Sequence, residues 1–288
     1  MFFGPKKAIF EITSRCNLKC RMCDIWKEKS KDFHINKFES VISELDGLKH
    51  IALTGGEPFL MPNLYDYIEV IRKKYPKIWI NISTNGTQTG KIVDLLDKCK
   101  DNKISLTISY DGINSNDKIR GNSKTSILRT ARILKKKKQK FSLKFTIQSA
   151  NHAEIYSTAK SIEHFGVPFY VKLEENLNCH QTRSIKPEPN MLKHMDSIIK
   201  QLKTVQELSI QTNRQYMNLL IFKKNKVTCN WSNKSIFITL DGKIFICRKM
   251  NPIGSIEVPF SKLWSGRKKI VQRMKRCNDK NCYSFGVK

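Results

Sequence analysis

Three cysteines lie close together near the start of the chain. Residues 13–26 read TSRCNLKCRMCDIW, so Cys16, Cys20 and Cys23 have the spacing C-x3-C-x2-C. Thiolates are soft ligands that bind iron–sulfur clusters and zinc, and three thiolates on a four-iron cluster leave one iron free for a small molecule. Structural zinc sites need four ligands, and no fourth cysteine lies nearby, with His34 the nearest histidine. The triplet favours a cluster over zinc.

A second group of four cysteines lies near the other end of the chain. Cys229 and Cys247 flank Gly242 with the spacing C-x12-G-x4-C, and Cys277 and Cys282 follow after a long gap. Four thiolates can bind every iron of a second four-iron cluster, which would then have no open position for a substrate. A four-thiolate structural zinc site is the alternative.

Polar, glycine-containing segments follow three of the expected strands. Residues 54–57 read TGGE, where paired glycines let the backbone approach a ligand and the glutamate offers an acceptor for an ammonium group. Residues 83–86 read STNG and residues 109–112 read SYDG. Each segment taken alone is also an ordinary turn sequence.

These residues depend on repeated strand–helix units for their positions. We predict six strands, most of them rich in β-branched or aromatic residues, at 8–13, 50–54, 79–84, 105–110, 142–148 and 169–173. Apolar residues three and four apart predict helices at 38–45, 64–75, 91–100, 123–136 and 153–165. The alternation predicts an α/β fold, a partial (β/α)6 TIM-like barrel, in which ligands bind at the carboxyl ends of the strands.

The pattern changes after residue 173. Residues 174–188 are polar and contain Pro187, which indicates a linker, and a helical stretch follows at 191–202. The last segment predicts a hairpin with Asp241-Gly242 at its turn and a helix near 263–274. We therefore expect a barrel over 1–175, a helical linker over 176–226, and a small α+β domain over 227–288 that needs a metal staple.

The cysteine triplet and the TGGE segment together resemble the radical S-adenosylmethionine (SAM) superfamily. The resemblance implies that Cys16, Cys20 and Cys23 bind a [4Fe-4S] cluster whose open iron binds SAM. It also implies that the TGGE segment binds the amino group of SAM, that polar residues after the third and fourth strands contact its ribose, and that Arg120 pairs with its carboxylate. Met22 departs from the family, which usually has an aromatic residue at this position. The implied cofactor contacts are Thr54, Gly55, Gly56, Glu57, Ser83, Asn85, Ser109, Asp111 and Arg120.

The second cysteine group resembles the first half of the SPASM and twitch domains, which add auxiliary clusters to radical SAM enzymes. The resemblance implies one auxiliary [4Fe-4S] cluster, bound by Cys229, Cys247, Cys277 and Cys282. The closing C-x4-C spacing departs from the tighter spacing of better-known twitch members. Cys179, in the predicted linker, is a candidate hydrogen-atom donor to a substrate radical, and the alternative is an ordinary linker cysteine.

The composition limits where the protein works and what it binds. No signal peptide or membrane-spanning run is present, so we expect a cytoplasmic protein without a membrane partner. The net charge of +28, from 53 Lys and Arg against 25 Asp and Glu, would suit an acidic partner such as nucleic acid or an acidic peptide. We favour a general lysine bias instead, because stretches such as 135–138 are typical of solvated helix faces.

The resemblance implies reductive cleavage of SAM to a 5′-deoxyadenosyl radical that abstracts hydrogen from a substrate. A peptide or protein is the first expectation, as in the maturases of modified peptides, and a small-molecule dehydrogenase or cyclase is the second. A zinc protein that binds nucleic acid is the alternative of another class. The expected partners are a flavodoxin- or ferredoxin-type electron donor and, since the cysteine loop begins at residue 16, a separate leader-peptide-binding protein.

Overall fold

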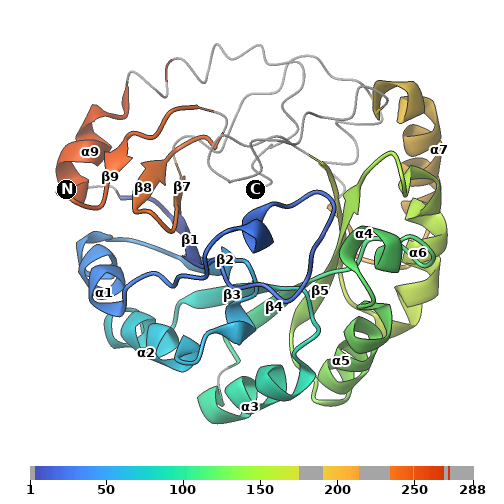
Figure 1. Cartoon of the computed structure of the whole chain (residues 1–288), viewed down its shortest axis with the longest axis horizontal. Helices are drawn as coiled ribbons and strands as arrows, with labels where there is room; N and C mark the ends of the chain where they lie inside the picture. Colours follow the sequence, from blue (N-terminus) through green and yellow to red (C-terminus); the bar gives the residue numbers. More distant parts are fainter. Residues whose placement is uncertain are drawn as a thin grey trace.

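The computed structural model describes residues 4–100, 102–174, 191–213, 234–248, 250–268 and 272. Its centre is a nine-stranded sheet with the strand order β6-β5-β4-β3-β2-β1-β7-β8-β9. The first six strands pair in parallel, each with its neighbour along the chain, and helices cover the outer side of the curved sheet (Figure 1). The predicted α/β partial barrel is confirmed, and its sheet is not closed.

The strands of the barrel lie within two residues of their predicted positions. Each run combines β-branched or aromatic residues with the alternation of a strand that has two different faces. The strands are β1 (Lys7–Thr13), β2 (His50–Gly55), β3 (Trp79–Thr84), β4 (Ile104–Ser109), β5 (Phe141–Ile147) and β6 (Phe169–Leu173).

The helices connect these strands and bury their apolar faces against the sheet. All five predicted barrel helices are present, and the last continues as a short 3-10 helix, η4 (Glu163–Phe165). The structure adds α4 (Asn116–Arg120), a five-residue helix in a segment for which no helix was predicted. The barrel helices are α1 (Ile35–Glu44), α2 (Leu64–Lys74), α3 (Thr89–Cys99), α5 (Lys124–Lys136) and α6 (Ile155–Ile162), with the 3-10 helices η1 (Ile25–Lys27), η2 (Pro58–Leu60) and η3 (His152–Glu154).

The two faces of the sheet differ in chemistry. On the outer face, alternate residues such as Ile80 and Ile82 of β3 and Leu143 and Phe145 of β5 pack in the main hydrophobic core with the helices. The residues between them point to the inner face, because side chains alternate along a strand. On β3 to β6 these inner residues are mostly polar: Asn81, Ser83, Ser105, Thr107, Ser109, Ser142, Lys144, Thr146, Tyr170 and Lys172.

Hydrogen bonds join some of these polar side chains across neighbouring strands. Asn81 Nδ2 donates to Ser105 Oγ at 3.1 Å, Thr107 Oγ1 donates to Asn81 Oδ1 at 3.2 Å, and the hydroxyls of Thr107 and Ser142 lie 3.3 Å apart. A closed TIM barrel fills this side with branched apolar residues. The polar inner face of this sheet is instead suited to a polar ligand.

The predicted carboxyl-terminal hairpin is present and extends the barrel sheet. β7 (Ser235–Ile238) and β8 (Lys243–Phe245) are antiparallel, and Gly242 at their turn has φ +80°, which favours glycine. β7 pairs in parallel with β1, and β9 (Gly254–Ser255) follows β8. α9 (Phe260–Gly266) then lies beside α1, where Phe260 N–H donates to Glu44 at 2.6 Å.

α7 (Met195–Val205), preceded by η5 (Met191–His194), packs on α6, in agreement with the helix predicted at 191–202. The predicted domain boundaries near residues 175 and 227 lie outside the described residues and stay predictions.

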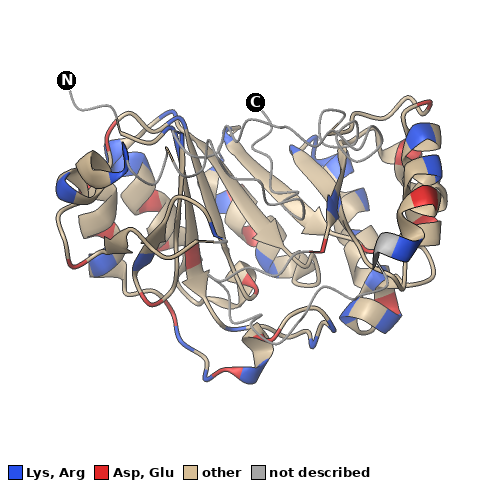
Figure 2. Ribbon diagram, turned by 90° about the horizontal axis from the view of Figure 1, so that it is seen from above, with Lys and Arg blue, Asp and Glu red and all other residues tan. Residues whose placement is uncertain are grey.

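Lysine and arginine residues are spread over the outer helices and loops (Figure 2). Residues 135–138 are exposed at the end of α5 and just beyond it, as expected for a solvated helix face. Within the described ranges, no helix combines the length and the apolar character needed to cross a membrane.

Candidate active site

The cysteine loop, residues 14–24, leaves the carboxyl end of β1 and is held at both ends. Thr13 Oγ1 donates to Asp32 at 2.6 Å, and Arg15 Nε forms an ion pair with the same carboxylate at 2.9 Å. Farther along the loop, Arg21 N–H donates to a backbone carbonyl of α4 at 2.9 Å. The loop therefore has a fixed position over the inner face of the sheet.

The three thiols of this loop are close enough to affect one another. Burial raises the pKa of the Cys16 thiol to about 11, and the thiols of Cys20 and Cys23 raise it further. Burial also raises the pKa of Cys20 and of Cys23. A metal centre that replaces the thiol protons would offset these penalties, because it neutralises the three thiolates at once.

The metal-binding capacity of the loop rests on the type and number of its donors. No group of three or more His, Cys, Asp or Glu side chains among the described residues is arranged around one metal ion. A four-iron cluster takes one thiolate per iron, and the donor set of Cys16, Cys20 and Cys23 suits it.

Gly55 and Gly56 bring the end of β2 against the cysteine loop. A Cβ on Gly55 would lie 2.2 Å from the Thr13 carbonyl oxygen, and a Cβ on Gly56 would lie 2.2 Å from that of Arg15. Gly56 N–H donates to the Thr13 carbonyl at 2.8 Å, and Glu57 N–H donates to the Arg15 carbonyl at 2.6 Å. This close packing therefore requires glycine at both positions.

The Glu57 carboxylate is fully buried and faces three donors of the protein. It accepts hydrogen bonds from Phe59 N–H at 3.2 Å, Thr84 Oγ1 at 2.8 Å and Asn85 N–H at 2.6 Å. Burial raises the pKa of Glu57 to about 7, against the opposite effect of these donors. In this structure Glu57 joins the ends of β2 and β3, a role that sequence reasoning did not anticipate.

Asp111 and Arg120 form a buried ion pair beside the cysteine loop. Arg120 Nε lies 2.6 Å from Asp111 Oδ2, and the other carboxylate oxygen accepts from Thr146 N–H at 2.7 Å. Arg120 Nη1 lies 4.0 Å from Cys20 Sγ. The Asp111 side chain is 0% exposed, and each of its carboxylate oxygens accepts from a protein donor. Asp111 therefore orients Arg120, and its predicted contact with the ribose stays a prediction.

Two asparagines complete these contacts, and sequence reasoning missed the first of them, Asn17. Asn17, directly after Cys16, accepts from Asn85 Nδ2 at 2.9 Å and donates to Thr87 Oγ1 at 2.9 Å. Asn151 Nδ2 donates to the Asp111 carbonyl at 3.0 Å. The position of Asn17 beside a predicted ligand was a usable signal, whereas the contact of Asn151 with Asp111 spans 40 residues.

The remaining predicted barrel residues lie at the same edge of the sheet. Thr54 pairs with Glu11 between β2 and β1, and Asn85 directly follows β3. Ser83 and Ser109 are partly buried on the inner face of neighbouring strands. The topology therefore brings these residues together beneath the cysteine loop, and their contacts with SAM stay predictions.

The second cysteine group lies mostly outside the described residues. This applies to Cys229, Cys277 and Cys282, and to Cys179 of the predicted linker. Cys247 is described: it follows β8 and is partly buried against the main core. The auxiliary cluster therefore stays a prediction.

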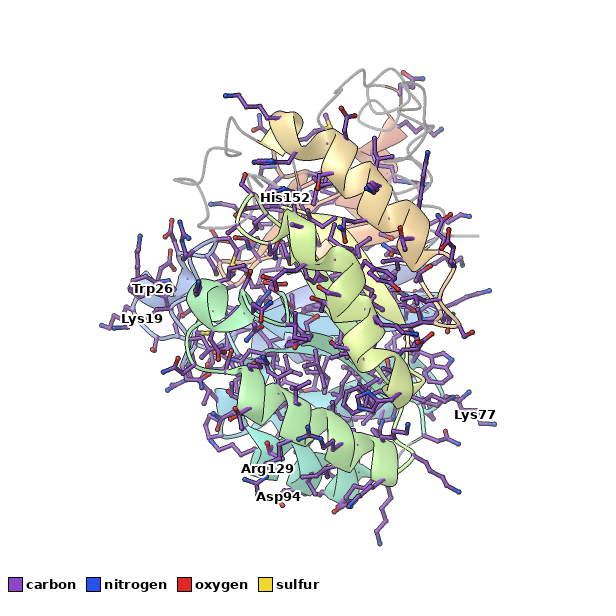
Figure 3. All side chains as sticks on the ribbon, turned by 90° about the vertical axis from the view of Figure 1, so that its right-hand side faces the viewer. Lys19, Trp26, Lys77, Asp94, Arg129 and His152 are labelled. Carbon is purple, nitrogen blue, oxygen red and sulfur yellow. The ribbon has the colours of Figure 1, made fainter. Side chains whose placement is uncertain are left out.

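The outer flank of the cysteine loop carries positive charge around an aromatic ring. The ammonium groups of Lys19 and Lys27 lie 5.7 and 5.3 Å from the ring centroid of Trp26 in η1, and Figure 3 shows Lys19 beside Trp26. Met22, at the position where an aromatic residue was expected, is partly exposed.

Comparison with known sequences agrees with this geometry. The model of the radical SAM superfamily matches residues 10–160. The antilisterial bacteriocin subtilosin biosynthesis protein AlbA of Bacillus subtilis is 35% identical over 139 residues, which cover 46% of this chain and 30% of AlbA. The chain thus spans less than a third of the length of this curated relative.

Comparison with solved structures supports the fold. Streptococcus suis SuiB bound to its precursor peptide SuiA has a TM-score of 0.70 at 15% identity, with 91% of this chain and 64% of SuiB covered. The protein anSMEcpe with bound SAM and the Cp18Cys peptide has a TM-score of 0.71 at 18% identity, with 96% and 85% covered. Both likenesses concern the fold alone.

Proposed function

Because the chain belongs to the radical SAM superfamily, we propose that it uses a [4Fe-4S] cluster on Cys16, Cys20 and Cys23 to modify a peptide substrate. When bound, this cluster would supply the electron that cleaves SAM into methionine and a 5′-deoxyadenosyl radical, which takes hydrogen from the substrate. The observation that carries the proposal is the contact between the three-thiol loop and the TGGE segment, held by hydrogen bonds of 2.8 and 2.6 Å.

The residues around the loop would orient the cofactor and exclude water. The backbone at Gly55 and Gly56 would bind the amino group of SAM, because Glu57 is already engaged by three donors. Arg120 would bind its carboxylate from a position fixed by Asp111. Ser83 and Ser109, on the inner face, would contact the ribose.

The relatives support a peptide as the substrate. AlbA takes part in the biosynthesis of a bacteriocin, and both solved structures reported above contain a peptide. Within this proposal, Cys229, Cys247, Cys277 and Cys282 bind an auxiliary [4Fe-4S] cluster, and a flavodoxin- or ferredoxin-type protein supplies electrons.

Anaerobic reconstitution tests the proposal directly. The purified protein, reduced with dithionite in the presence of SAM, is expected to hold about eight irons per chain and to release 5′-deoxyadenosine. Cys20→Ala should abolish 5′-deoxyadenosine, whereas Cys277→Ala should keep the first cluster and lower the iron content to about four. A protein that binds zinc and leaves SAM intact would refute the assignment.

The substrate class needs a separate measurement. The reconstituted protein should modify a precursor peptide encoded beside its gene, and mass spectrometry of the peptide would report the change. If the protein converts a small molecule and leaves every such peptide unchanged, the peptide assignment is wrong. The second expected class, a small-molecule dehydrogenase or cyclase, would then take its place.

A further inference from the structure

Two lysines lie on the inner face of the barrel where the site described above does not use them. Lys144 is in the middle of β5, between Leu143 and Phe145, which point to the outer core. Lys172 occupies the equivalent inner position on β6, between Val171 and Leu173. Each cation therefore lies on the side of the sheet that faces the candidate active site.

The register places these lysines beside the expected cofactor contacts. Lys144 pairs with Ser109 of β4 and with Tyr170 of β6, and Lys172 pairs with Thr146 of β5. Lys144 and Lys172 are thus diagonal neighbours on adjacent strands, a separation that long side chains bridge easily. A group held between them would lie one strand away from Ser109.

The charges around Lys144 are mostly positive. Burial lowers the pKa of Lys144 to about 7, and the charges of Lys172, Arg248 and Arg120 lower it further, while Asp111 acts in the opposite direction. Asp111 is already paired with Arg120, and no ion pair joins Lys144 to a carboxylate within the described ranges. The fold thus places Lys144 near other cations with no ion pair of its own to a carboxylate of the described ranges, an arrangement that a bound anion would stabilise.

Gln148 provides an independent indication of a missing acceptor. It directly follows β5, and the residue is 6% exposed. Its Nε2 is buried and has no hydrogen-bond partner in the part of the chain that the structure describes. A buried donor without an acceptor is unfavourable, so this amide group is expected to bind a ligand oxygen.

We propose that Lys144, Lys172 and Gln148 bind an anionic group of the substrate, a carboxylate or a phosphate, on the inner face of β5 and β6. The proposal rests on the proposed function, because the anion would hold the substrate beside the cofactor contacts. The guanidinium carbon of Arg248 lies 5.1 Å from the ring centroid of Phe237 in β7, and the positive charge of Arg248 also acts on Lys144. The reacting carbon would then lie near an acidic group of the substrate.

Calorimetric titration of the reconstituted protein with SAM bound would test this assignment. The probes are glutarate, which models an acidic side chain, inorganic phosphate, and neutral glutaramide. Glutarate or phosphate should bind, and Lys144→Met or Lys172→Met should weaken that binding about tenfold, whereas Lys144→Arg should retain it. Lys136→Met, at an exposed position on α5, is the matched control for the general positive charge and should bind like the wild type.

The pH dependence gives a second measurement. Anion binding favours the protonated amine, so it raises the pKa of Lys144, takes up a proton at pH 8, and weakens as the pH rises through about 7. Titrations in buffers of different ionisation enthalpy report this proton. Lys144→Met should lose the proton uptake even if it retains some affinity for the anion.

The outcomes separate this inference from the proposed function. Preference for glutarate assigns a carboxylate, and preference for phosphate assigns a phosphoryl group. Equal anion affinity in the wild type and Lys144→Met, equal binding of glutaramide, or no anion binding at all would overturn the inference. Release of 5′-deoxyadenosine without substrate, measured on the same preparations, tests the proposed function and does not depend on Lys144.

Discussion

At the level of single residues, the candidate site depends on side chains that position other side chains. Asp111 uses one oxygen for Arg120 and the other for Thr146 N–H, and Asn151 holds the backbone of Asp111. The sequence predicted that polar residues gather at the carboxyl ends of the strands, because each polar segment follows a strand. The pairing of Asp111 with Arg120 could not, since the same sequence is also compatible with a direct contact to a cofactor.

Asp111→Asn should destabilise the protein by about 3 kcal/mol, because it leaves the buried Arg120 without a counter-charge and turns an amide N–H₂ toward a donor. The measurement is the free energy of unfolding in urea. Asp97→Asn, which breaks the exposed pair with Lys137, is the control and should cost less than about 1 kcal/mol. Equal effects of the two changes would show that the buried pair has no special structural role.

At the level of elements, the strands were predictable and some of their connections were not. Local sequence patterns predicted the bounds of β1 to β6 to within two residues, because alternation and β-branched residues can be recognised in short segments. α4 was missed, since five residues are too few to show a repeated helical pattern of apolar residues. The pairing of β7 with β1 joins residues more than two hundred positions apart, and no local pattern carries that information.

Gly56→Ala should separate the end of β2 from the cysteine loop, because the added Cβ would lie 2.2 Å from a backbone oxygen that cannot move away cheaply. We expect lower stability, by roughly 2 kcal/mol, and less iron bound after reconstitution. Urea unfolding and iron analysis would measure the two effects. Gly90→Ala in α3, where a Cβ meets open space, is the matched control and should be neutral or slightly stabilising. Full iron loading of Gly56→Ala would argue against this contact as a support of the cluster.

At the level of the whole molecule, the carboxyl-terminal hairpin shares its sheet and its core with the barrel. β7 continues the sheet beyond β1, and Trp264 of α9 is 1% exposed within the main hydrophobic core. The sequence predicted a small domain over 227–288 from local features, a hairpin and four cysteines, and its boundaries stay a prediction. The shared sheet and core link the stability of the hairpin to that of the barrel, because unfolding of the hairpin would expose apolar surface of the barrel.

We therefore expect the barrel and the hairpin to unfold in one transition. A variant in which Trp264 is the sole tryptophan, with Trp26, Trp79 and Trp231 changed to Phe, reports on α9 by its fluorescence in urea. Circular dichroism of the same sample reports on the barrel helices, which supply most of the helical signal of the described residues. The two midpoints should coincide, because both signals follow the loss of one core. A fluorescence transition at clearly lower urea would mean that α9 leaves the core while the barrel remains folded, and the continuity of the sheet from β1 to β7 would then contribute little to the stability of the hairpin.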